Sequence, residues 1–516
     1  FYYPTFFMYL AFFMYGALYV AGFLVRHFQS PNDLLNLFLT SPEIFYVLPR
    51  LLSAVFGTLT VWLAYLTGRE YEGRRTGLLA AFFLAINFLH CRDSHFATTD
   101  IAMTFFIVLS MLTLLKSIRQ RRKALYFLSV FFAGVATSVK YNSFVLLISL
   151  FLSYGIFFLA DRWKMDRKKA VLQCLADGVL AGGLCFAGFF IFSPYVVLDW
   201  GSARQFLLHL QKINAELNVP FFYHFKMLYH AMGMPLLAAA VAGGVFSPPA
   251  FRGKVLVLAS LILPYYILVA RAGQPHERYI LPLIPFLAIW AAHFFAGLFE
   301  RASKDRRLAG LPAIVLLLMT LLTLPKTLFS DMLFMKRDTR DLAKEWLEKN
   351  APSGSVLALD DPMHGPRLVR SKDQVKEALA RLGPEGPLRE TKSRRLAALL
   401  SLEPYPSPHY NLFYLSRSDE AGLFSLQGPF VAYDFNELGK ISADYLVTSG
   451  TERGNNPEFY VFAEKHFEVA AEFDPLKNRS GETTKGWTTM PIDKTLWAFK
   501  RPGPLIRIFR LKSGRA

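Results

Sequence analysis

The sequence predicts a polytopic α-helical membrane protein with a C-terminal α/β domain outside the membrane. Three observations lead to this fold class: long apolar runs fill the first two thirds of the chain, basic residues alternate between the connections, and the pattern changes near residue 331. The 516 residues are 53% hydrophobic, with a mean hydropathy of +0.30. This composition excludes a purely soluble enzyme and a disordered chain.

Ten apolar runs approach the length that crosses a bilayer. They cover residues 44–67, 75–90, 98–118, 124–139, 141–160, 171–192, 226–247, 254–270, 279–299 and 308–329. Each is expected to be a helix, because in hydrocarbon only a helix satisfies its own backbone. The run 124–139 is short, so its ends depend on its neighbours. Residues 5–25 are also apolar, and they form either a further span or a helix lying in the interface.

Basic residues mark one side of the membrane. One set of alternate connections holds 19 Lys and Arg residues, against seven in the other set. The positive-inside rule places the first set in the cytoplasm, and the connections 91–98, 138–142, 193–225 and 271–278 outside. The net charge of +18 then reflects topology, and no nucleic-acid partner is expected. The richer set consists of Arg69, Arg74, Arg75, Lys116, Arg119, Arg121, Arg122, Lys123, Arg162, Lys164, Arg167, Lys168, Lys169, Arg252, Lys254, Arg301, Lys304, Arg306 and Arg307.

A domain boundary is expected near residue 330, with a multi-helix membrane domain over 1–330 and an extracytoplasmic α/β domain over 331–516. In the second domain, Asp338 is a suitable N-cap for a helix that runs to Asn350. That helix would present Leu342, Trp346 and Leu347 as its apolar face. Strands are expected over 355–360, 445–448 and 505–510, and another helix over 457–467.

The cysteines bear on disulfide bonds, and the first residues bear on where the native chain begins. Three cysteines, Cys91, Cys174 and Cys185, cannot build a disulfide framework. The chain opens at Phe1 inside an apolar stretch, with neither Met nor a signal-peptide n-region. We therefore expect the native chain to begin upstream of Phe1.

The densest group of polar residues lies in the connection from His90 to Asp100. Arg92, Asp93, His95 and Asp100 fall within nine residues at the membrane surface. Ionisable groups at that depth are costly and are often functional. The plainer alternative is that Asp100 only caps the helix that it begins.

Two further external connections carry polar residues. One holds Lys140 and Tyr141, which are also typical of a snorkelling cation and an interfacial aromatic ring. The other runs from Arg271 to Tyr279 through Glu277 and Arg278. Pro282 and Pro285 follow, and they should loosen the start of the next helix. All three connections share one face, where cations suit a phosphate and carboxylates suit a metal or a proton.

The order and spacing of several motifs resemble the polyprenyl-phosphate-sugar-dependent GT-C glycosyltransferases, the superfamily of protein O-mannosyltransferases and lipid A aminoarabinose transferases. The likeness covers nearly the whole chain. The matching stretches are Phe1-Tyr-Tyr-Pro-Thr-Phe-Phe7, Pro49-Arg50-Leu-Leu-Ser-Ala54, Gly73-Arg-Arg-Thr-Gly77, Arg92 to Asp100, Gly134-Val-Ala-Thr-Ser-Val-Lys140-Tyr141, Glu277-Arg278-Tyr279-Ile-Leu-Pro282, and Asp338 to Gly354.

The resemblance implies roles for individual residues. Catalytic roles fall to Asp100, His95 and Glu277, and donor-phosphate binding falls to Arg92, Lys140, Arg278 and Tyr141. The family's first external loop carries an acidic residue that is its expected base. Asp33 and Glu43 lie too late in the chain to match it, so we expect the base upstream of Phe1 and expect this chain alone to be inactive. A divalent ion, Mg²⁺ or Mn²⁺, is left open, with Asp100 as a candidate ligand.

The implied activity is transfer of a sugar from a polyprenyl-phosphate donor to a protein, lipid or glycan acceptor at the outer face of a prokaryotic cytoplasmic membrane, with inversion at the anomeric carbon. The alternative from another class is a transporter or flippase for a lipid-linked or anionic substrate. It predicts charges near the bilayer midplane and inverted repeats, and the sequence displays neither. A receptor with a membrane anchor is a third class, but ten helices exceed what an anchor needs.

Overall fold

The computed structural model describes residues 4–159, 167–216, 219–271, 276–305, 307, 309–361, 364–381, 387–415, 429–450, 456–477, 491 and 493–511. Arg162, Lys164, Arg306 and residues 272–275 of the third external connection lie outside these ranges. The chain forms two compact units, Phe1–Leu24 with Glu43–Phe329 and Val25–Pro42 with Ser330–Ala516. Residues 25–42, which the sequence analysis assigns to the membrane domain, therefore group with the second unit.

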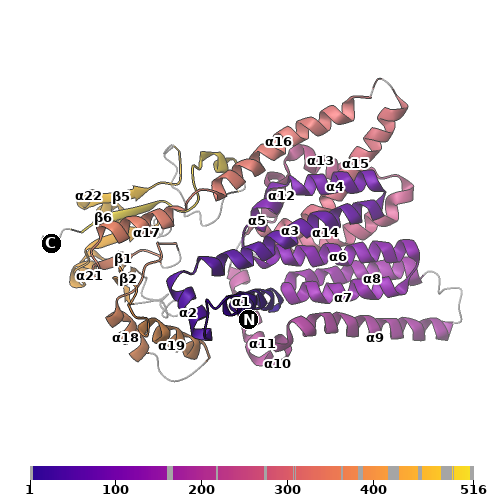
Figure 1. Cartoon of the computed structure of the whole chain (residues 1–516). Coiled ribbons are helices and arrows are strands. Elements are labelled where there is room, and N and C mark those ends of the chain that lie inside the picture. The colour runs from indigo at the N-terminus through magenta and orange to yellow at the C-terminus, as the bar shows by residue number, and fades with distance from the viewer. Residues whose placement is uncertain are drawn as a thin grey trace. The chain divides into compact units, whose positions relative to one another are not determined.

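The first unit is a bundle of long helices (Figure 1). Within the described residues, eight helices are long and apolar enough to cross a membrane, or nine if one bent pair counts as a single span. This confirms the prediction of a polytopic α-helical protein. The helices are α1 (Phe6–Leu24), α3 (Glu43–Tyr71), α4 (Arg74–Ala85), α5 (Phe88–Ser94), α6 (Thr99–Gln120), α7 (Lys123–Val139), η1 (Tyr141–Val145), α8 (Leu146–Tyr154), η2 (Gly155–Leu159), α9 (Arg167–Phe192), α10 (Pro194–Leu198), α11 (Trp200–Glu216), α12 (Tyr223–Met232), α13 (Met234–Val245), η4 (Pro249–Phe251), α14 (Arg252–Arg271), η5 (Glu277–Leu283), α15 (Ile284–Lys304) and α16 (Leu311–Phe334).

Two of the expected continuous helices are broken, so those two predictions are wrong. The run 75–90 divides because α4 ends at Ala85 and Asn87 caps a new helix, α5. The run 226–247 divides into α12 and α13, which meet at 107°. Gly233 lies at that break with φ of 75°, a conformation that favours glycine. The first turns around Pro282 form the 3₁₀ helix η5, as the prolines predicted.

Small residues bring the helices of the bundle close together. On α7, a Cβ atom added at Gly134 would lie 2.0 Å from the Cys185 carbonyl oxygen of α9, so only glycine fits there. Between α6 and α7, the Ser110 hydroxyl donates to the Ser129 carbonyl oxygen and the Ser129 hydroxyl donates to that of Ser110, each at 2.8 Å. These contacts fix α7, whose end carries Lys140, against α6, whose start carries Asp100.

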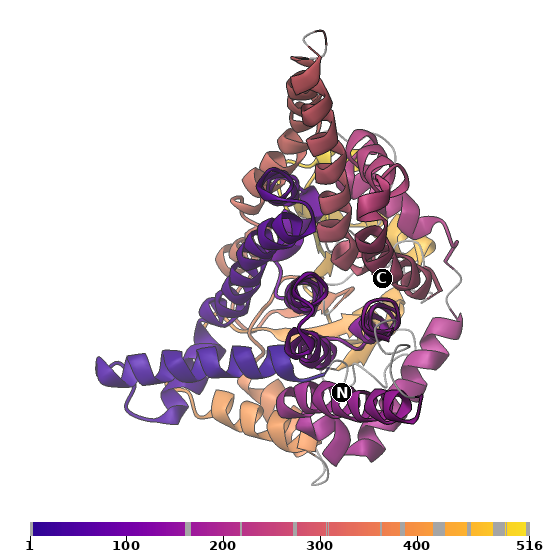
Figure 2. The ribbon, with the colours of Figure 1, turned by 90° about the vertical axis from the view of Figure 1, so that its right-hand side faces the viewer.

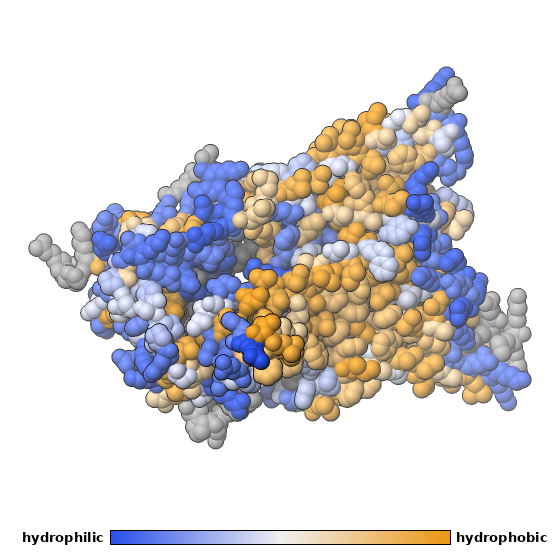
Figure 3. Space-filling view, in the orientation of Figure 1, coloured by the Kyte–Doolittle hydropathy of each residue, from blue (hydrophilic) through white to orange (hydrophobic). Residues whose placement is uncertain are grey.

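Apolar side chains cover the flanks of the bundle. Figure 2 looks along the axes of several of its helices (purple). In Figure 3 these flanks are mostly orange, and blue residues gather at the end of the bundle where α9 begins. Many large apolar residues are exposed on these flanks, among them Trp62, Phe151, Val179 and Leu322. Such a surface is expected for helices that face lipid.

The second unit contains a mixed six-stranded sheet. The strand order is β3-β2-β1-β4-β6-β5, in which β3, β2, β1 and β4 run parallel and β6 and β5 are antiparallel to their neighbours. The strands are β1 (Val356–Leu359), β2 (Asn411–Leu415), β3 (Phe430–Val431), β4 (Tyr445–Thr448), β5 (Glu468–Phe473) and β6 (Ile506–Arg510). Its helices are α2 (Pro31–Thr40), α17 (Thr339–Asn350), α18 (Lys372–Ala380), α19 (Pro387–Leu400), α21 (Phe435–Lys440) and α22 (Pro457–His466), with the 3₁₀ helix η7 (Lys494–Ala498). This confirms the predicted α/β fold.

Helices cover both faces of this sheet. Successive side chains of a strand point to opposite faces, so neighbouring residues of one strand contact different helices. Leu357 and Leu359 of β1 pack in one core with Leu347 of α17, whereas Ala358 packs in the other core with Ala463 of α22. Asp338 caps α17, since its side chain accepts a hydrogen bond from the Arg340 backbone N–H. The strands over 356–359, 445–448 and 506–510 agree with the sequence prediction, which missed β2, β3 and β5.

Asp360 follows β1 and is buried inside the second unit. Its carboxylate accepts hydrogen bonds from the Ser449 backbone N–H at 2.8 Å and from the Tyr460 hydroxyl at 2.6 Å. Burial nevertheless raises the pKa of Asp360 to about 6, because desolvation outweighs those bonds. The group joins the ends of the parallel strands β1 and β4.

Candidate active site

Three predicted site residues meet in a buried ion-pair group, which we call the Asp100 group. Asp100 Oδ1 lies 2.7 Å from Lys140 Nζ, and Asp100 Oδ2 lies 3.5 Å from Arg278 Nε. Asp100 and Lys140 are 1% and 4% exposed. With one carboxylate and two cations, the group carries one positive charge in excess. That excess suits an anion with one negative charge.

A second group, the Arg92 group, contains Arg92, Asp93 and Glu277. The Arg92 guanidinium donates to Asp93 Oδ2 at 2.9 and 3.0 Å and to Glu277 Oε2 at 3.1 Å. Asp93 also interacts electrostatically with Asp100 and Lys140, so the two groups are neighbours. Since Glu277 and Arg278 are adjacent in the chain, η5 contributes one residue to each group.

Helix ends position these side chains. Arg92 and Asp93 lie on the short helix α5, and Asp100 is the second residue of α6. Lys140 occupies the extended residue between α7 and η1, and its ammonium lies 4.3 Å from the centre of the Tyr279 ring. The charges therefore gather where α5, α6, α7 and η5 begin or end, at one face, as the sequence predicted.

The cap alternative for Asp100 does not describe the observed contacts. Thr98 is the N-cap of α6 and makes no side-chain capping bond, while both carboxylate oxygens of Asp100 face cations. The alternative of a snorkelling Lys140 is also not supported, because the ammonium is buried against Asp100 and Tyr279. Both residues are held inside the protein, where unpaired charges would be costly.

Two of the predicted site residues are not part of either ion-pair group. His95 is exposed at the end of α5, and its Nδ1 lies 2.9 Å from the Cys91 carbonyl oxygen. The Tyr141 hydroxyl is buried and has no hydrogen-bond partner among the described residues. The role of each predicted residue remains a proposal, but the geometry separates His95 from Asp100 and Glu277.

The residues at this site do not fit a divalent metal ion. Asp100, the candidate ligand, directs one oxygen to Lys140 and the other to Arg278. Within the described ranges, no three His, Cys, Asp or Glu side chains form a group that could hold a metal. We therefore derive no step through Mg²⁺ or Mn²⁺.

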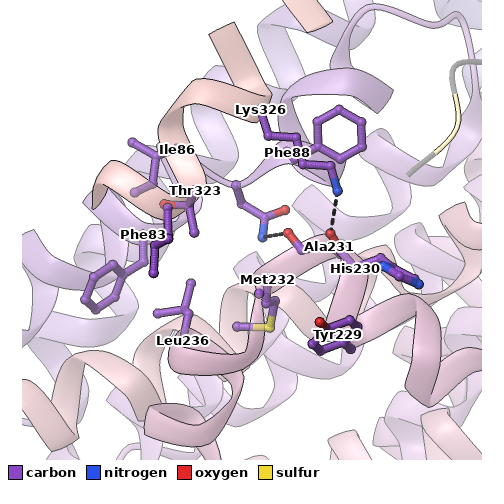
Figure 4. A pocket seen from close by; sticks show the side chains of 13 residues that line it. Phe83, Ile86, Phe88, Tyr229, His230, Ala231, Met232, Leu236, Thr323 and Lys326 are labelled. Carbon is purple, nitrogen blue, oxygen red and sulfur yellow. Dashed lines mark hydrogen bonds between the residues drawn. The ribbon is translucent and has the colours of Figure 1, made fainter. Parts of the chain in front are cut away.

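A cavity of about 170 Å³ lies at the break between α12 and α13, and Asn87 and Phe88 line it (Figure 4). The break leaves carbonyl groups without helical partners, and two side chains bind them. Lys326 Nζ donates to the His230 carbonyl oxygen at 2.7 Å, and Asn87 Nδ2 donates to that of Ala231 at 3.0 Å. Phe88 lines the cavity and is also near the Arg92 group, since Lys326 lies 4.3 Å and Arg92 5.9 Å from the centre of its ring.

Sequence reasoning missed several residues around the site. Asn87 both caps α5, by accepting from the His90 backbone N–H at 3.0 Å, and binds the broken end of α12. Its position one residue before an apolar helix start was the available signal. His224 and Tyr265 also approach the site, and nothing in their apolar surroundings marked them in the sequence.

The fold and the site together define a multi-span membrane protein with a buried, charged site where several helices end. Residues 47–182 match the family model described as dolichyl-phosphate-mannose-protein mannosyltransferase. This match confirms the predicted resemblance and the enzyme class, a glycosyltransferase, and it favours that class over a transporter. No curated protein matches the chain in sequence.

Two kinds of solved structure are similar to the chain. The archaeal oligosaccharyltransferase AglB from Archaeoglobus fulgidus, in complex with an inhibitory peptide and a dolichol-phosphate, has a TM-score of 0.48 and 14% identity, over 97% of this chain and 69% of that chain. ArnT from Cupriavidus metallidurans bound to undecaprenyl phosphate has a TM-score of 0.44 and 14% identity, over 82% of each chain. Both similarities are distant.

Proposed function

We propose that the protein transfers a sugar from a polyprenyl-phosphate donor to a hydroxyl group of an acceptor, with the donor phosphate bound between Lys140, Arg278 and Arg92. The acceptor belongs to a protein, a lipid or a glycan. The observation that carries this proposal is the Asp100 group, which gathers a buried cation, Lys140, and a partly exposed one, Arg278, around one buried carboxylate, in a bundle that matches a mannosyltransferase family over residues 47–182.

The charge of the Asp100 group fits the leaving group. A polyprenyl-phosphate sugar is a phosphodiester with one negative charge. When the bond from the anomeric carbon to the phosphate oxygen breaks, the bond's electron pair stays on the phosphate, which gains a second charge. Lys140 and Arg278 stabilise that developing charge, and the removal of one such preorganised donor typically costs about 10²–10³ in rate.

Asp100 then serves as a positioning residue. Its two oxygens hold Lys140 and Arg278 on either side, so both cations are in place before the donor arrives. Both oxygens of Asp100 are thus engaged by cations. Among the described residues, Glu277 is the better candidate to take the proton from the acceptor, since its side chain is 21% exposed and pairs there with Arg92 alone. Proton removal by such a group contributes about 10²–10⁴ in rate.

Attack by the acceptor oxygen from the face opposite the phosphate inverts the anomeric carbon. The oxygen–carbon bond forms as the carbon–phosphate oxygen bond breaks, and the acceptor proton passes to the carboxylate. The isoprenoid tail of the donor needs an apolar path to the site. The exposed apolar flanks of the bundle supply such a surface to the bilayer (Figure 3).

The membrane orientation is part of the proposal. The excess of basic residues in one set of connections supports an orientation with the site and residues 331–516 outside the cytoplasm of a prokaryotic cell. A reporter that is active only outside, fused after Arg510, should be active in cells. Activity of a cytoplasm-only reporter at that position would reject this orientation.

The test of function uses the protein at its native length, including the residues that we expect upstream of Phe1, in lipid vesicles with defined polyprenyl-phosphate sugars, including mannose, glucose and aminoarabinose donors, and extracted membrane acceptors. We expect transfer from at least one donor and release of polyprenyl phosphate. Movement of intact donor lipid across the bilayer, without cleavage, would instead favour the flippase alternative.

A further inference from the structure

Two buried side chains next to the site have polar atoms without hydrogen-bond partners among the described residues. They are the hydroxyl of Tyr265 and both ring nitrogens of His224. Both residues are 0% exposed. An unsatisfied polar group in a protein interior costs about 1–3 kcal/mol, so native structures keep few of them and usually use those that they keep.

Tyr265 approaches the site from α14. That helix packs against η1 and η5, the two elements that directly follow Lys140 and contain Arg278. Tyr265 also interacts electrostatically with Asp100 and Tyr279. The phenol therefore lies beside the Asp100 group, yet it makes no hydrogen bond to any described residue.

His224 approaches from the first turn of α12. This helix packs against η5 and α5, which carry Glu277 and Arg92. The residue before it, Tyr223, interacts electrostatically with Glu277 and Arg92, and His224 itself interacts with His276. His224 and Tyr265 thus reach the site from two helices, one beside each ion-pair group.

The chemistry of these two groups differs from that of the cations. A phenol donates and accepts one hydrogen bond each, and a neutral imidazole has one donor and one acceptor. A sugar hydroxyl also donates and accepts, so it satisfies either group without adding charge. A phosphate is instead matched by Lys140 and Arg278, which offer donors and positive charge.

We propose that Tyr265 and His224 bind hydroxyl groups of the transferred sugar and determine which sugar the enzyme accepts. This rests on the proposed function, because it assigns the sugar of the same donor to the uncharged side of the site. Tyr141, whose hydroxyl also has no partner among the described residues, would complete this set.

The first experiment separates the sugar from the phosphate. The full chain in nanodiscs is titrated with undecaprenyl phosphate and with undecaprenyl-phosphate mannose and glucose, and affinity is followed by the shift in unfolding temperature. For Tyr265→Phe and His224→Leu we expect unchanged affinity for the sugar-free lipid and about tenfold weaker affinity for the sugar donor that the wild type prefers. Equal losses for both lipids, or no loss for either, would overturn the proposal.

The second measurement separates ligand binding from a structural role. Because the Tyr265 hydroxyl makes no bond inside the protein, Tyr265→Phe should unfold at the same temperature as the wild type or higher when no donor is present. Tyr71→Phe is the matched control, since Tyr71, the last residue of α3, is as deeply buried as Tyr265. This variant should leave donor selectivity unchanged. A lower unfolding temperature for Tyr265→Phe without donor would show a structural role and overturn its assignment, while His224→Leu still tests the imidazole.

Monodeoxy donors identify the hydroxyl groups. For the donor that lacks the hydroxyl bound by Tyr265, the wild type and Tyr265→Phe should transfer equally well, although they differ with the complete sugar. If the two proteins differ by the same factor with every donor, the proposal fails. If the wild type binds and cleaves no polyprenyl-phosphate sugar, the proposed function fails with it, whereas a fully active wild type with unchanged variants rejects only this inference.

Discussion

Asp100 and Lys140 are separated by 40 residues, yet Asp100 Oδ1 lies 2.7 Å from Lys140 Nζ and both side chains are buried. Each charge is tolerable because the other is present. The pair links the start of α6 to the end of α7, and Arg278 of η5 adds a second cation to the same carboxylate.

Asp100→Asn should lower both activity and stability. It leaves Lys140 buried without its carboxylate, which typically costs about 3–5 kcal/mol. We expect sugar transfer by the folded fraction to fall by about 10² or more, since the cations lose their alignment. Asp100→Asn/Lys140→Met should recover much of the unfolding temperature without recovering transfer. Normal transfer by Asp100→Asn would contradict the assigned role.

Lys140→Ala and Arg278→Ala should weaken use of the donor. Each removes a cation that we place on the phosphate, so kcat/KM for the donor should fall by about 10²–10³ while membrane insertion is unchanged. Arg119 pairs with Glu70 where α6 ends, at the opposite end of that helix from Asp100, and Arg119→Ala provides a matched control. Steady-state kinetics with a varied donor concentration give the result. A similar loss in the Arg119 variant would point to a general effect of removing charge.

His95→Ala should leave transfer within a few-fold of the wild type. The side chain is exposed, and one of its ring nitrogens, Nδ1, lies 2.9 Å from the carbonyl oxygen of Cys91 in α5. An exposed residue outside the ion-pair groups is a poor candidate for proton transfer at the site. A drop of 10² or more in kcat, with normal folding, would restore the catalytic role that the family resemblance implied.

Asn87→Ala should destabilise the membrane unit without a specific effect on donor binding. The side chain caps α5 and binds the Ala231 carbonyl oxygen at the break after α12. Loss of the cap costs about 1 kcal/mol, and the unsatisfied carbonyl adds about 1–3 kcal/mol. Unfolding temperature in detergent measures the change. A variant that is as stable as the wild type would show that the break does not need this residue.

The stability of the second unit should fall as pH rises from 4 to 6. Asp360 has a pKa of about 6 in the folded protein, above its usual value, so the folded state binds its proton more tightly than the unfolded state. This contribution is present in full below about pH 4 and is lost as pH rises through 6. At roughly 1.4 kcal/mol per pKa unit, the loss is about 3 kcal/mol.

Hydrogen exchange of β1 and β4 peptides in the full chain, corrected for the intrinsic exchange rate at each pH, measures this dependence. Asp360→Asn keeps the shape but does not titrate, so its protection should lose the pH dependence between 4 and 6. The same slope in wild type and variant would assign the effect to another group.

Much of the fold and part of the site were accessible from short-range patterns. Hydropathy located the membrane helices, and Asp338 marked the start of α17, because these features depend on neighbouring residues. The short strands β2, β3 and β5 were missed, since pairing with distant strands stabilises them more than their own sequences do. Likewise, the sequence predicted that Arg92, Lys140 and Arg278 lie on one side of the membrane, but it did not predict which carboxylates they pair with.

By itself, the sequence determined that this is a multi-span membrane protein with a C-terminal α/β fold and charged residues in particular connections. Only the tertiary structure decided that Asp100 binds Lys140 and Arg278, that Arg92 joins Glu277 across 185 residues, and that His95 lies outside both groups. It also decided that α12 and α13 bend at Gly233. The physical reason is range: hydropathy and capping act over a few residues, whereas ion pairing in a membrane bundle depends on which helix ends the packing brings together.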